Sequence, residues 1–470
     1  MHLTVRAGAV IFLLSVAAIA GSKPGIVWDA GGVTGRDVWS ARGNGKKVRL
    51  RTGRNDEDAT LLTVSPNGRR IAWWLVAPGQ TALRDLVVAR TAGGRGRNVT
   101  EKLDGKVVTA KFTGDSKHVL FIHEDAATGR ADLWRANARG KGLRNLTAEL
   151  TGTATGTIHV SQFDAEVLVV WEFADRTGLV LADVRRGVPT VLDTDLPEGA
   201  PGGYAFWPEA GVLHFTWRET GAEKDDLWQR DETNLERRVT EIDSARGLAT
   251  EATVAVRGVE LLLVEHDDLR TFPAPARILR VSRGIANQRP VVAVEGDGRV
   301  RVYELDSHDE PRELLPQESL DEVEEIVVAV EQGFTYVTGK SEGVRRLFFL
   351  VPSHSSTPGD LADGLPGRVG ALRTLLPTGG LIFSMVAEHG SFGEFHVSRA
   401  QYVVDTLIAR TDLVGLPGRA VVSPKSGDVL FNVIAMPEAD NRVFLWDRKK
   451  DEIRPLTPPN QRPGTFLFTR

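Results

Sequence analysis

Histidines and carboxylates gather in short polar segments of this chain, most of which follow apolar runs, and these are the side chains best able to do chemistry. Imidazole nitrogens and carboxylate oxygens bind divalent cations, and carboxylates without a local partner attract cationic groups. The histidines are candidate metal ligands and the carboxylates are candidate binding residues. The histidines are His123, His266 and His389, and the carboxylates are Asp56, Glu57, Asp58, Glu124, Asp125, Asp267, Asp268 and Glu388.

Three interpretations of these residues are open. They are the solvated ends of exposed turns, where charged side chains are common. They form an acidic face that recognises a partner. Or several of them converge on a divalent cation in a catalytic site. The first interpretation needs no further assumption, so no catalytic residue and no metal ligand is assigned. No cofactor is expected in the first two interpretations, and the third requires a divalent cation.

One pentapeptide has the spacing of a hydrolase nucleophile, Gly339-Lys340-Ser341-Glu342-Gly343. A nucleophile elbow of the Gly-x-Ser-x-Gly type lies on a turn from a strand into a helix. Here apolar strand-like runs stand on both sides, at 334–337 and 346–350, and no helical pattern follows. The pentapeptide therefore predicts a hairpin turn and not a nucleophile.

Composition excludes several further classes. The chain has no cysteine, which rules out thiol catalysis and thiolate metal sites. A formal net charge of −4 gives no basic field to attract nucleic acid. Neither a Walker-type loop nor a dinucleotide fingerprint is present.

The elements that must position the polar segments are repeated. The tripeptides Asp37-Val38-Trp39, Asp85-Leu86-Val87, Asp132-Leu133-Trp134 and Asp226-Leu227-Trp228 are separated by 48, 47 and 94 residues. A period in the forties, carried by short strands, is typical of a β-propeller. Each unit also has a turn, an apolar run after the turn, and a closing Arg-x-(Leu/Val)-Thr element such as Arg97-Asn98-Val99-Thr100. We therefore expect four strands in each blade, a to d, with the Asp-Leu-Trp element in strand c and the Arg-x-(Leu/Val)-Thr element in strand d.

The number of blades follows from the turns between strands a and b. These turns are expected near 65, 113, 161, 207, 257, 331, 377 and 423, and only the step of 74 residues from 257 to 331 breaks the period. We place an additional hairpin near 291–316 in that step. The Trp and Asp of strand c are predicted to pack and hydrogen-bond inside the blades.

The two ends of the chain complement each other. The first unit lacks a strand a, and residues 465–469 form a lone strand after the last repeat. We predict that this strand completes the first blade, which removes free sheet edges. The fold is thus predicted to be all-β, a closed propeller of about eight four-stranded blades (seven to nine), with two smaller propellers as the alternative.

Residues 1–20 are predicted to be a secretory signal peptide, followed by the propeller domain over 21–470. Arg6 gives a positive start, residues 7–20 are apolar, and Ala18 and Ala20 fit a small-x-small cleavage site. An uncleaved N-terminal anchor is the alternative, although the apolar run is short for a bilayer. Export and the absence of cysteine predict a bacterial periplasmic or secreted protein.

The segment 65–100 reads Ser-Pro-Asn-Gly-Arg-Arg-Ile-Ala, then Asp-Leu-Val-Val, then Arg-Asn-Val-Thr, and resembles the repeat of TolB-like propellers. The same repeat occurs in the propeller domains of prolyl oligopeptidase and dipeptidyl peptidase relatives. The resemblance implies a propeller that binds partners or covers another active site. The hydrolase domain of those relatives is not expected here, and neither is the extra N-terminal domain of TolB, because strands begin near Ile26.

We therefore predict an exported, non-enzymatic propeller that binds a protein or another macromolecule of the cell envelope. It is expected to be a monomer, to bind no nucleic acid and to have no integral membrane segment after signal cleavage. The alternative is a metal-dependent polysaccharide lyase or hydrolase, with a histidine and carboxylate site at the mouth of the propeller channel.

Overall fold

The computed structural model describes residues 25–468 apart from 32–35, 43–48, 51–57, 77–83, 93–95, 164, 210, 232–233, 249–251, 266–267, 283–288, 297, 306–309, 317–319, 330–333, 351–358, 364, 366, 376–379, 387–392, 400–402, 407–414, 424–425, 436–441 and 458–461. In this part of the chain the secondary structure is strand throughout, except for one short 3-10 helix, η1 (Asp193–Asp195). The predicted all-β class is confirmed.

Ten sheets of four antiparallel strands, here called blades 1 to 10, are formed by the described residues. Blade 1 contains β40 (Arg462–Phe468), β1 (Gly25–Gly31), β2 (Arg36–Arg42) and β3 (Arg49–Leu50). Blade 2 contains β4 (Asp58–Val64), β5 (Arg70–Val76), β6 (Asp85–Arg90) and β7 (Arg97–Asn98). Blade 3 contains β8 (Gly105–Phe112), β9 (His118–Asp125), β10 (Ala131–Asn137) and β11 (Arg144–Asn145). Blade 4 contains β12 (Thr153–Val160), β13 (Glu166–Glu172), β14 (Thr177–Asp183) and β15 (Val188–Val191). Blade 5 contains β16 (Gly199–Glu209), β17 (Val212–Glu219), β18 (Asp225–Arg230) and β19 (Leu235–Ile242).

The second half of the chain continues the same pattern. Blade 6 contains β20 (Ser244–Leu248), β21 (Ala252–Arg257), β22 (Glu260–Val264) and β23 (Leu269–Pro273). Blade 7 contains β24 (Arg277–Val281), β25 (Val291–Gly296), β26 (Arg299–Glu304) and β27 (Arg312–Glu313). Blade 8 contains β28 (Glu322–Ala329), β29 (Phe334–Ser341), β30 (Val344–Leu350) and β31 (Gly359–Asp360). Blade 9 contains β32 (Arg368–Leu375), β33 (Leu381–Val386), β34 (Gly393–Arg399) and β35 (Val403–Thr406). Blade 10 contains β36 (Gly415–Val422), β37 (Val429–Ala435), β38 (Arg442–Asp447) and β39 (Glu452–Pro455).

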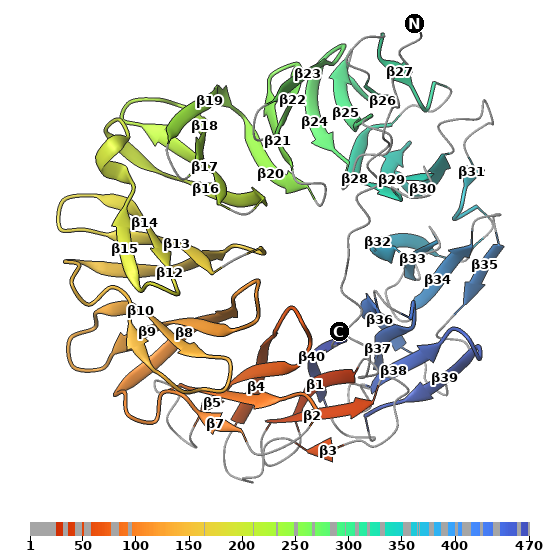
Figure 1. Ribbon diagram of the computed structural model, residues 1–470. Helices are drawn as coiled ribbons and strands as arrows, with labels where there is room; N and C mark the ends of the chain where they lie inside the picture. Colours follow the sequence, from red (N-terminus) through yellow and green to blue (C-terminus); the bar gives the residue numbers. More distant parts are fainter. Residues whose placement is uncertain are drawn as a thin grey trace, which may run out of the picture.

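The blades follow one another around a common centre, with strand a of each blade innermost (Figure 1). In blade 1 this innermost strand is β40. The strands form where the sequence is rich in β-branched and aromatic residues, which favour the pleated, buried environment of a sheet. In β9, for example, the run from Val119 to Ile122 has no exposed surface. The apolar side chains pack between blades: one cluster joins Leu120 and Leu133 of blade 3 to Val167 and Trp171 of blade 4.

The prediction for the two chain ends is confirmed. Strand β40 pairs with β1 in an antiparallel register that places Phe466 opposite Trp28. Phe466 and Trp28 also belong to a buried cluster with Leu430 and Leu445 of blade 10. The C-terminal strand therefore serves as strand a of the first blade.

The predicted number of blades is wrong, because the described residues form ten four-stranded sheets and not seven to nine. The additional hairpin predicted near 291–316 is part of a complete blade, since β25 and β26 are flanked by β24 and β27. The turn near 257 joins β21 to β22 and is therefore a b–c turn. Blade 6 is shorter than the repeat, since its first strand starts at Ser244 and that of blade 7 already starts at Arg277. The chain between the turns near 207 and 331 therefore contains three blade-to-blade steps, where the period predicted two.

Connections between strands lie at two opposite faces of the molecule. Neighbouring strands within every blade are antiparallel, so the b–c and d–a connections lie at one face, here called the b–c face, and the a–b and c–d connections lie at the other. Among the described residues, no helix is long and apolar enough to cross a membrane.

Candidate functional site

The repeated polar residues hold the blades together. In blade 2 the Thr100 hydroxyl donates to the Asp85 carboxylate at 2.7 Å, and the Asn98 amide donates to its other oxygen at 2.8 Å. The backbone N–H of Leu86 in turn donates to the Thr100 hydroxyl at 3.0 Å. Blade 3 repeats the contact between Thr147 and Asp132 at 3.0 Å. The prediction that these residues are internal hydrogen-bonding elements is confirmed, and they are not available to a ligand.

The strand c tryptophans are likewise structural. Trp228 is buried in the cluster between blades 4 and 5. Trp134 and Trp39 are half-buried and pack against inter-blade clusters, as predicted. The stacking of the Arg237 guanidinium on the Trp228 ring, 5.0 Å from its centre, further covers that ring.

The pentapeptide around Ser341 is a hairpin turn, as predicted. Strands β29 and β30 pair up to Ser341 and Val344, and only Glu342 and Gly343 lie between them. Both of these residues have positive φ angles, 52° and 75°, as a two-residue type I′ turn requires. Ser341 is buried within β29. No strand-to-helix elbow is present at this position.

Three of the predicted site residues follow one another in blade 3. His123 is buried and packs edge-to-face against Trp134, with the ring centres 6.4 Å apart. Burial lowers the pKa of His123, although nearby carboxylates such as Asp125 oppose the shift. Glu124 forms a 2.8 Å ion pair with Lys106. Asp125 accepts hydrogen bonds from the backbone and hydroxyl of Thr128 and so belongs to its own turn.

Of the remaining candidate residues, Asp58 and Asp268 lie in the described part of the chain. Asp58 is exposed at the start of β4, on the b–c face. Asp268 lies between β22 and β23, in a c–d connection, and is therefore on the opposite face from Glu124 and Asp125. The a–b turn predicted near 257 implies that the run 260–264 is strand b and that Asp268 follows it in a b–c connection. This prediction is wrong, because the run is strand c. Asp56, Glu57, His266, Asp267, Glu388 and His389 lie outside the described residues.

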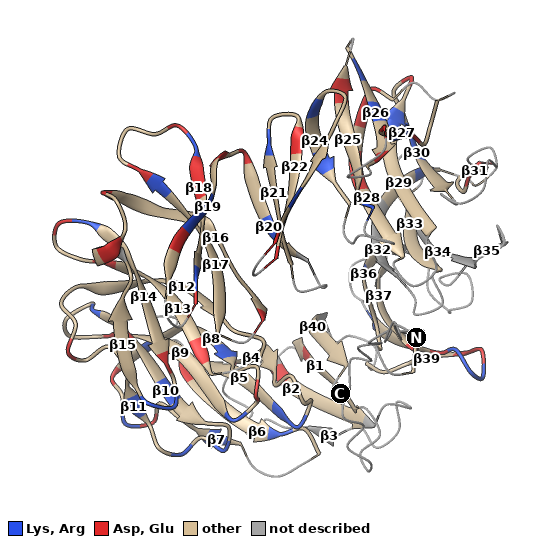
Figure 2. Cartoon of the chain, turned by 45° about the horizontal axis from the view of Figure 1, so that its top comes forward, with Lys and Arg blue, Asp and Glu red and all other residues tan. Residues whose placement is uncertain are grey.

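The described part of the chain contains no group of three or more histidines and carboxylates that could hold a metal ion. Figure 2 shows acidic and basic residues interspersed over the described strands. Two of the predicted carboxylates form local ion pairs, Glu124 with Lys106 and Asp268 with Arg270. These pairs agree with the interpretation of solvated loop ends for the residues concerned.

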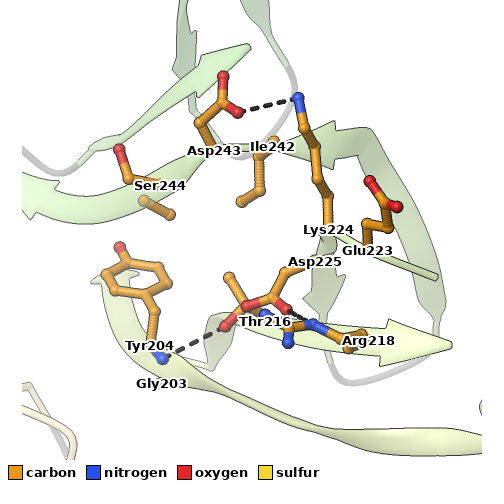
Figure 3. Close-up of a pocket in the computed structure, with 11 residues that line it drawn as sticks. Gly203, Tyr204, Thr216, Arg218, Glu223, Lys224, Asp225, Ile242, Asp243 and Ser244 are labelled. Carbon is orange, nitrogen blue, oxygen red and sulfur yellow. Dashed lines mark hydrogen bonds and ion pairs between the residues drawn. The ribbon is translucent and has the colours of Figure 1, made fainter. Parts of the chain in front are cut away.

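A different site, which the sequence did not indicate, lies between blades 5 and 6. It is a pocket of 480 Å³ at the b–c face, and Figure 3 shows how its side chains surround it. Blade 5 supplies most of the wall, and blade 6 closes it through the start of β20. The lining residues are Gly203, Tyr204, Thr216, Arg218, Glu223, Lys224, Asp225, Ile242, Asp243, Ser244 and Ala245.

The pocket exists because blade 5 departs from the repeat. Strand d of blades 2 and 3 has two residues, whereas β19 has eight and pairs with β18 as far as Ile242 opposite Asp225. Arg238 stands where Asn98 stands in blade 2, so the amide that binds the strand c aspartate is missing. Asp226 instead accepts a hydrogen bond from the backbone of Glu241 at 2.8 Å. Only Asp243 then separates β19 from β20, and the crossing to blade 6 forms the pocket wall.

Two ion pairs fix the polar wall of the pocket. The Arg218 guanidinium donates to the Asp225 carboxylate at 2.7 Å, and the Lys224 ammonium lies 2.9 Å from the Asp243 carboxylate (Figure 3). Asp243 also accepts a hydrogen bond from the backbone N–H of Gly258 at 2.6 Å, which ties the crossing to blade 6. The hydrogen bond from Lys224, followed by that from Gly258, lowers the pKa of the Asp243 carboxyl.

A buried hydrogen-bonded chain leads from the pocket into the interface between the two blades. The Tyr204 hydroxyl lies 2.8 Å from the Thr253 hydroxyl, which lies 2.8 Å from Nδ1 of His214. Nε2 of His214 is 2.8 Å from the side-chain oxygen of Gln229. His214 and Thr253 have no exposed surface, and burial raises the pKa of the Tyr204 hydroxyl far above its ordinary value. Polar groups this deeply buried are stable only because each has a partner.

Comparison with solved structures supports the fold. A eukaryotic initiation factor matches with a TM-score of 0.52 and 10% sequence identity, over 95% of this chain and 99% of that one. Dipeptidyl peptidase 4 of Porphyromonas gingivalis gives a TM-score of 0.48 at 12% identity, over 84% of this chain and 59% of that one. TolB of Acinetobacter baumannii gives 0.27 at 12% identity, over 62% of this chain and 66% of that one.

The chain is a propeller repeat protein with four-stranded blades. The repeated sheets carry this conclusion, and the predicted TolB-like propeller repeat is confirmed as a fold. The match to the initiation factor, at 10% identity, shows the fold alone and does not transfer an activity. No protein-family model matches the chain, and a search of curated proteins found no match.

Proposed function

We propose that this chain is an exported, non-enzymatic β-propeller that binds a partner protein of the cell envelope, and that the pocket between blades 5 and 6 is its recognition point. One observation carries the proposal: this pocket is lined by polar side chains that the repeated blade contacts do not use. Sites that recognise partners are commonly built in this way, on loops and strand ends held by a rigid scaffold.

The scaffold in this proposal is a closed ring. The pairing of β40 with β1 and the packing of both strands on blade 10 support closure. A closed ring leaves no free sheet edge between the first and last blades, so the blades beside the pocket stay in fixed positions. Binding to a preformed pocket also costs less conformational entropy than binding to a mobile surface.

The arrangement of charges favours binding over catalysis at this pocket. Arg218 and Lys224 each form an ion pair with an aspartate, and these ion pairs hold the side chains of the pocket wall in position. His214, which is linked to the pocket through Thr253 and Tyr204, is enclosed between Thr253 and Gln229 and has no exposed surface. A general base must reach the proton it removes, and this imidazole does not reach a ligand in the pocket.

Export is part of the proposal and rests on the sequence of residues 1–20. Arg6, the apolar run 7–20 and the small residues Ala18 and Ala20 support a cleaved signal peptide. A periplasmic or secreted location would bring the b–c face into contact with other envelope proteins.

The test is affinity capture from the envelope fraction of the native cell with a variant that fills the pocket. Ser244 is exposed at the pocket, so Ser244→Arg adds bulk and positive charge there with little expected effect on folding. The matched control is Thr157→Arg, at an exposed position of β12 in blade 4. We expect a partner that binds the wild type and the Thr157→Arg variant but not Ser244→Arg. Capture that is unchanged by Ser244→Arg would remove the pocket from the proposal.

Metal analysis of the purified mature chain accompanies this experiment. A stoichiometric divalent cation, together with cleavage of a polysaccharide, would replace the proposal with the alternative of a lyase or hydrolase. Capture of a specific partner by protein without bound metal would support the proposal.

A further inference from the structure

The direction of the buried hydrogen-bonded chain determines which groups Tyr204 offers to the pocket. Full burial disfavours a charged imidazole, so His214 is assigned as neutral. The side-chain oxygen of Gln229 can only accept, which places the imidazole proton on Nε2. Nδ1 is then an acceptor, and the Thr253 hydroxyl donates to it. With its own proton used, Thr253 accepts from the Tyr204 hydroxyl. The phenol proton therefore points into the interface, and the lone pairs of the phenol oxygen remain as acceptors.

The rest of the pocket also offers acceptors, and both of its cationic donors are already paired. Glu223, Asp225 and Asp243 bring three negative charges, whereas Arg218 and Lys224 bring two positive charges. Each cation is paired with an aspartate, which leaves the exposed Glu223 carboxylate as the excess charge. Ser244 adds a hydroxyl on the opposite wall (Figure 3). The pocket thus combines one net negative charge with several acceptor oxygens.

We propose that the pocket between blades 5 and 6 binds a basic side chain, arginine or lysine, of the partner protein. This inference rests on the proposed function and specifies its ligand. Glu223 supplies the opposing charge, the Tyr204 oxygen accepts a hydrogen bond, and the Tyr204 ring provides a face on which a guanidinium can stack. An anionic group has no free cation to meet in the pocket, because Arg218 and Lys224 are already held by carboxylates.

The test uses two tripeptide probes of nearly the same size and shape, acetyl-Gly-Arg-Gly-amide and the same peptide with citrulline in place of arginine, which replaces the charged guanidinium by a neutral ureido group. Ligand-observed NMR at pH 7 and low salt gives the dissociation constant of each probe for the full mature chain. A single side chain binds weakly, so we expect a constant on the order of 1 mM for the arginine probe. The citrulline probe should bind at least about fivefold more weakly, because it has lost the charge.

Two variants test the assigned roles. Glu223→Gln should weaken the arginine probe by about twofold to fivefold, the usual range for an exposed ion pair, and should not affect the citrulline probe. Tyr204→Phe keeps the ring and should weaken the arginine probe by about tenfold, since it removes an acceptor for a charged donor. The matched controls are Glu149→Gln, an exposed carboxylate in blade 3, and Tyr303→Phe in blade 7.

Equal binding of the arginine and citrulline probes would overturn the inference, as would tighter binding of acetyl-Gly-Glu-Gly-amide. Unchanged binding by both variants would overturn it too. These outcomes differ from failure of the proposed function, which is read from the Ser244→Arg capture. If Ser244→Arg abolishes capture while the arginine probe fails, the pocket binds a partner of other chemistry and only the present inference is lost.

Discussion

The backbone N–H of Thr465 donates a hydrogen bond of 2.6 Å to the carboxylate of Asp29, a residue 436 positions earlier in the chain. Asp29 has no exposed surface and lies in β1, where the pairing with β40 shifts register between Trp28 and Ala30. The shift leaves the backbone N–H of Thr465 without a carbonyl partner in the neighbouring strand, and the Asp29 carboxylate accepts its hydrogen bond instead. The two chain ends are therefore joined by a side chain as well as by the strand pairing.

We predict that Asp29→Ala destabilises the protein by about 1 to 3 kcal/mol, because it removes a buried carboxylate and leaves the half-buried N–H of Thr465 without its acceptor. Asp29→Asn keeps an acceptor oxygen and should cost less. The free energy of unfolding from urea denaturation measures both effects. Asp175→Ala, which removes an exposed carboxylate of blade 4, is the control and should change stability by less than about 0.5 kcal/mol. Equal effects of Asp29→Ala and Asp175→Ala would show that the contact does not stabilise the joined ends.

The second prediction concerns the repeated contact between strands c and d. Thr100→Val has nearly the same shape as threonine but removes the hydroxyl that binds Asp85 and accepts from the Leu86 N–H. Because Thr100 is buried, the two groups lose their partner without gaining water, and the expected loss is about 1 to 3 kcal/mol. Thr100→Ser should recover most of the stability, whereas Thr157→Val on the exposed face of β12 should be nearly neutral. A serine variant as unstable as the valine variant would point to packing of the methyl group as the cause.

The sequence predicted the parts of the fold that are specified by short, local sequence motifs. Asp85 and Thr100 belong to repeated motifs, so their hydrogen bonds could be predicted. The pairing of the chain ends could also be predicted, because the first blade lacks a strand a and a lone strand follows the last repeat. Blades 6 and 7 lack the Asp-Leu-Trp element, and the run 260–264 resembles strand b as closely as strand c. One misassigned strand then moved Asp268 to the wrong face.

The pocket could not be predicted in the same way. Tyr204 and Thr253 are 49 positions apart, and neither stands in a motif, so only the packing of blade 5 on blade 6 brings them together. The one available signal was Arg238 in place of the asparagine of the Arg-Asn-(Leu/Val)-Thr element. That change was visible, but its consequence depends on how far β19 continues along β18, which the local sequence does not determine.

The third prediction tests export. We expect the mature chain isolated from the native cell to begin at Gly21, after cleavage behind Ala20. Mass spectrometry of the intact protein measures this directly. Ala20→Leu enlarges a position that signal cleavage requires to be small, and should leave the full-length chain attached to the membrane fraction. A wild-type protein that keeps residues 1–20 would contradict the prediction and favour the uncleaved anchor.

The last prediction is a pH dependence that originates at Asp243. Its pKa is lowered in the folded protein by the hydrogen bonds from Lys224 and Gly258. A carboxyl group with a lowered folded-state pKa stabilises the protein fully above its unfolded-state pKa of about 3.9, and this contribution is lost as the pH falls through the folded-state pKa. Asp243→Asn should therefore be less stable than the wild type at pH 7, by roughly 0.5 to 1.5 kcal/mol for the weakened hydrogen bonds.

The difference between the two proteins should shrink as the pH is lowered below about 4, because the Asp243 carboxyl of the wild type is then protonated first in the unfolded state and, at lower pH, in the folded state. Urea denaturation at pH 7, 5, 4 and 3 measures this convergence. Asp175→Asn, at an exposed carboxylate of blade 4, is the control and should show no such convergence. A stability difference for Asp243→Asn that stays constant from pH 7 to pH 3 would mean that the ionised carboxylate does not hold the crossing between blades 5 and 6, and that the pocket wall is fixed by the backbone alone.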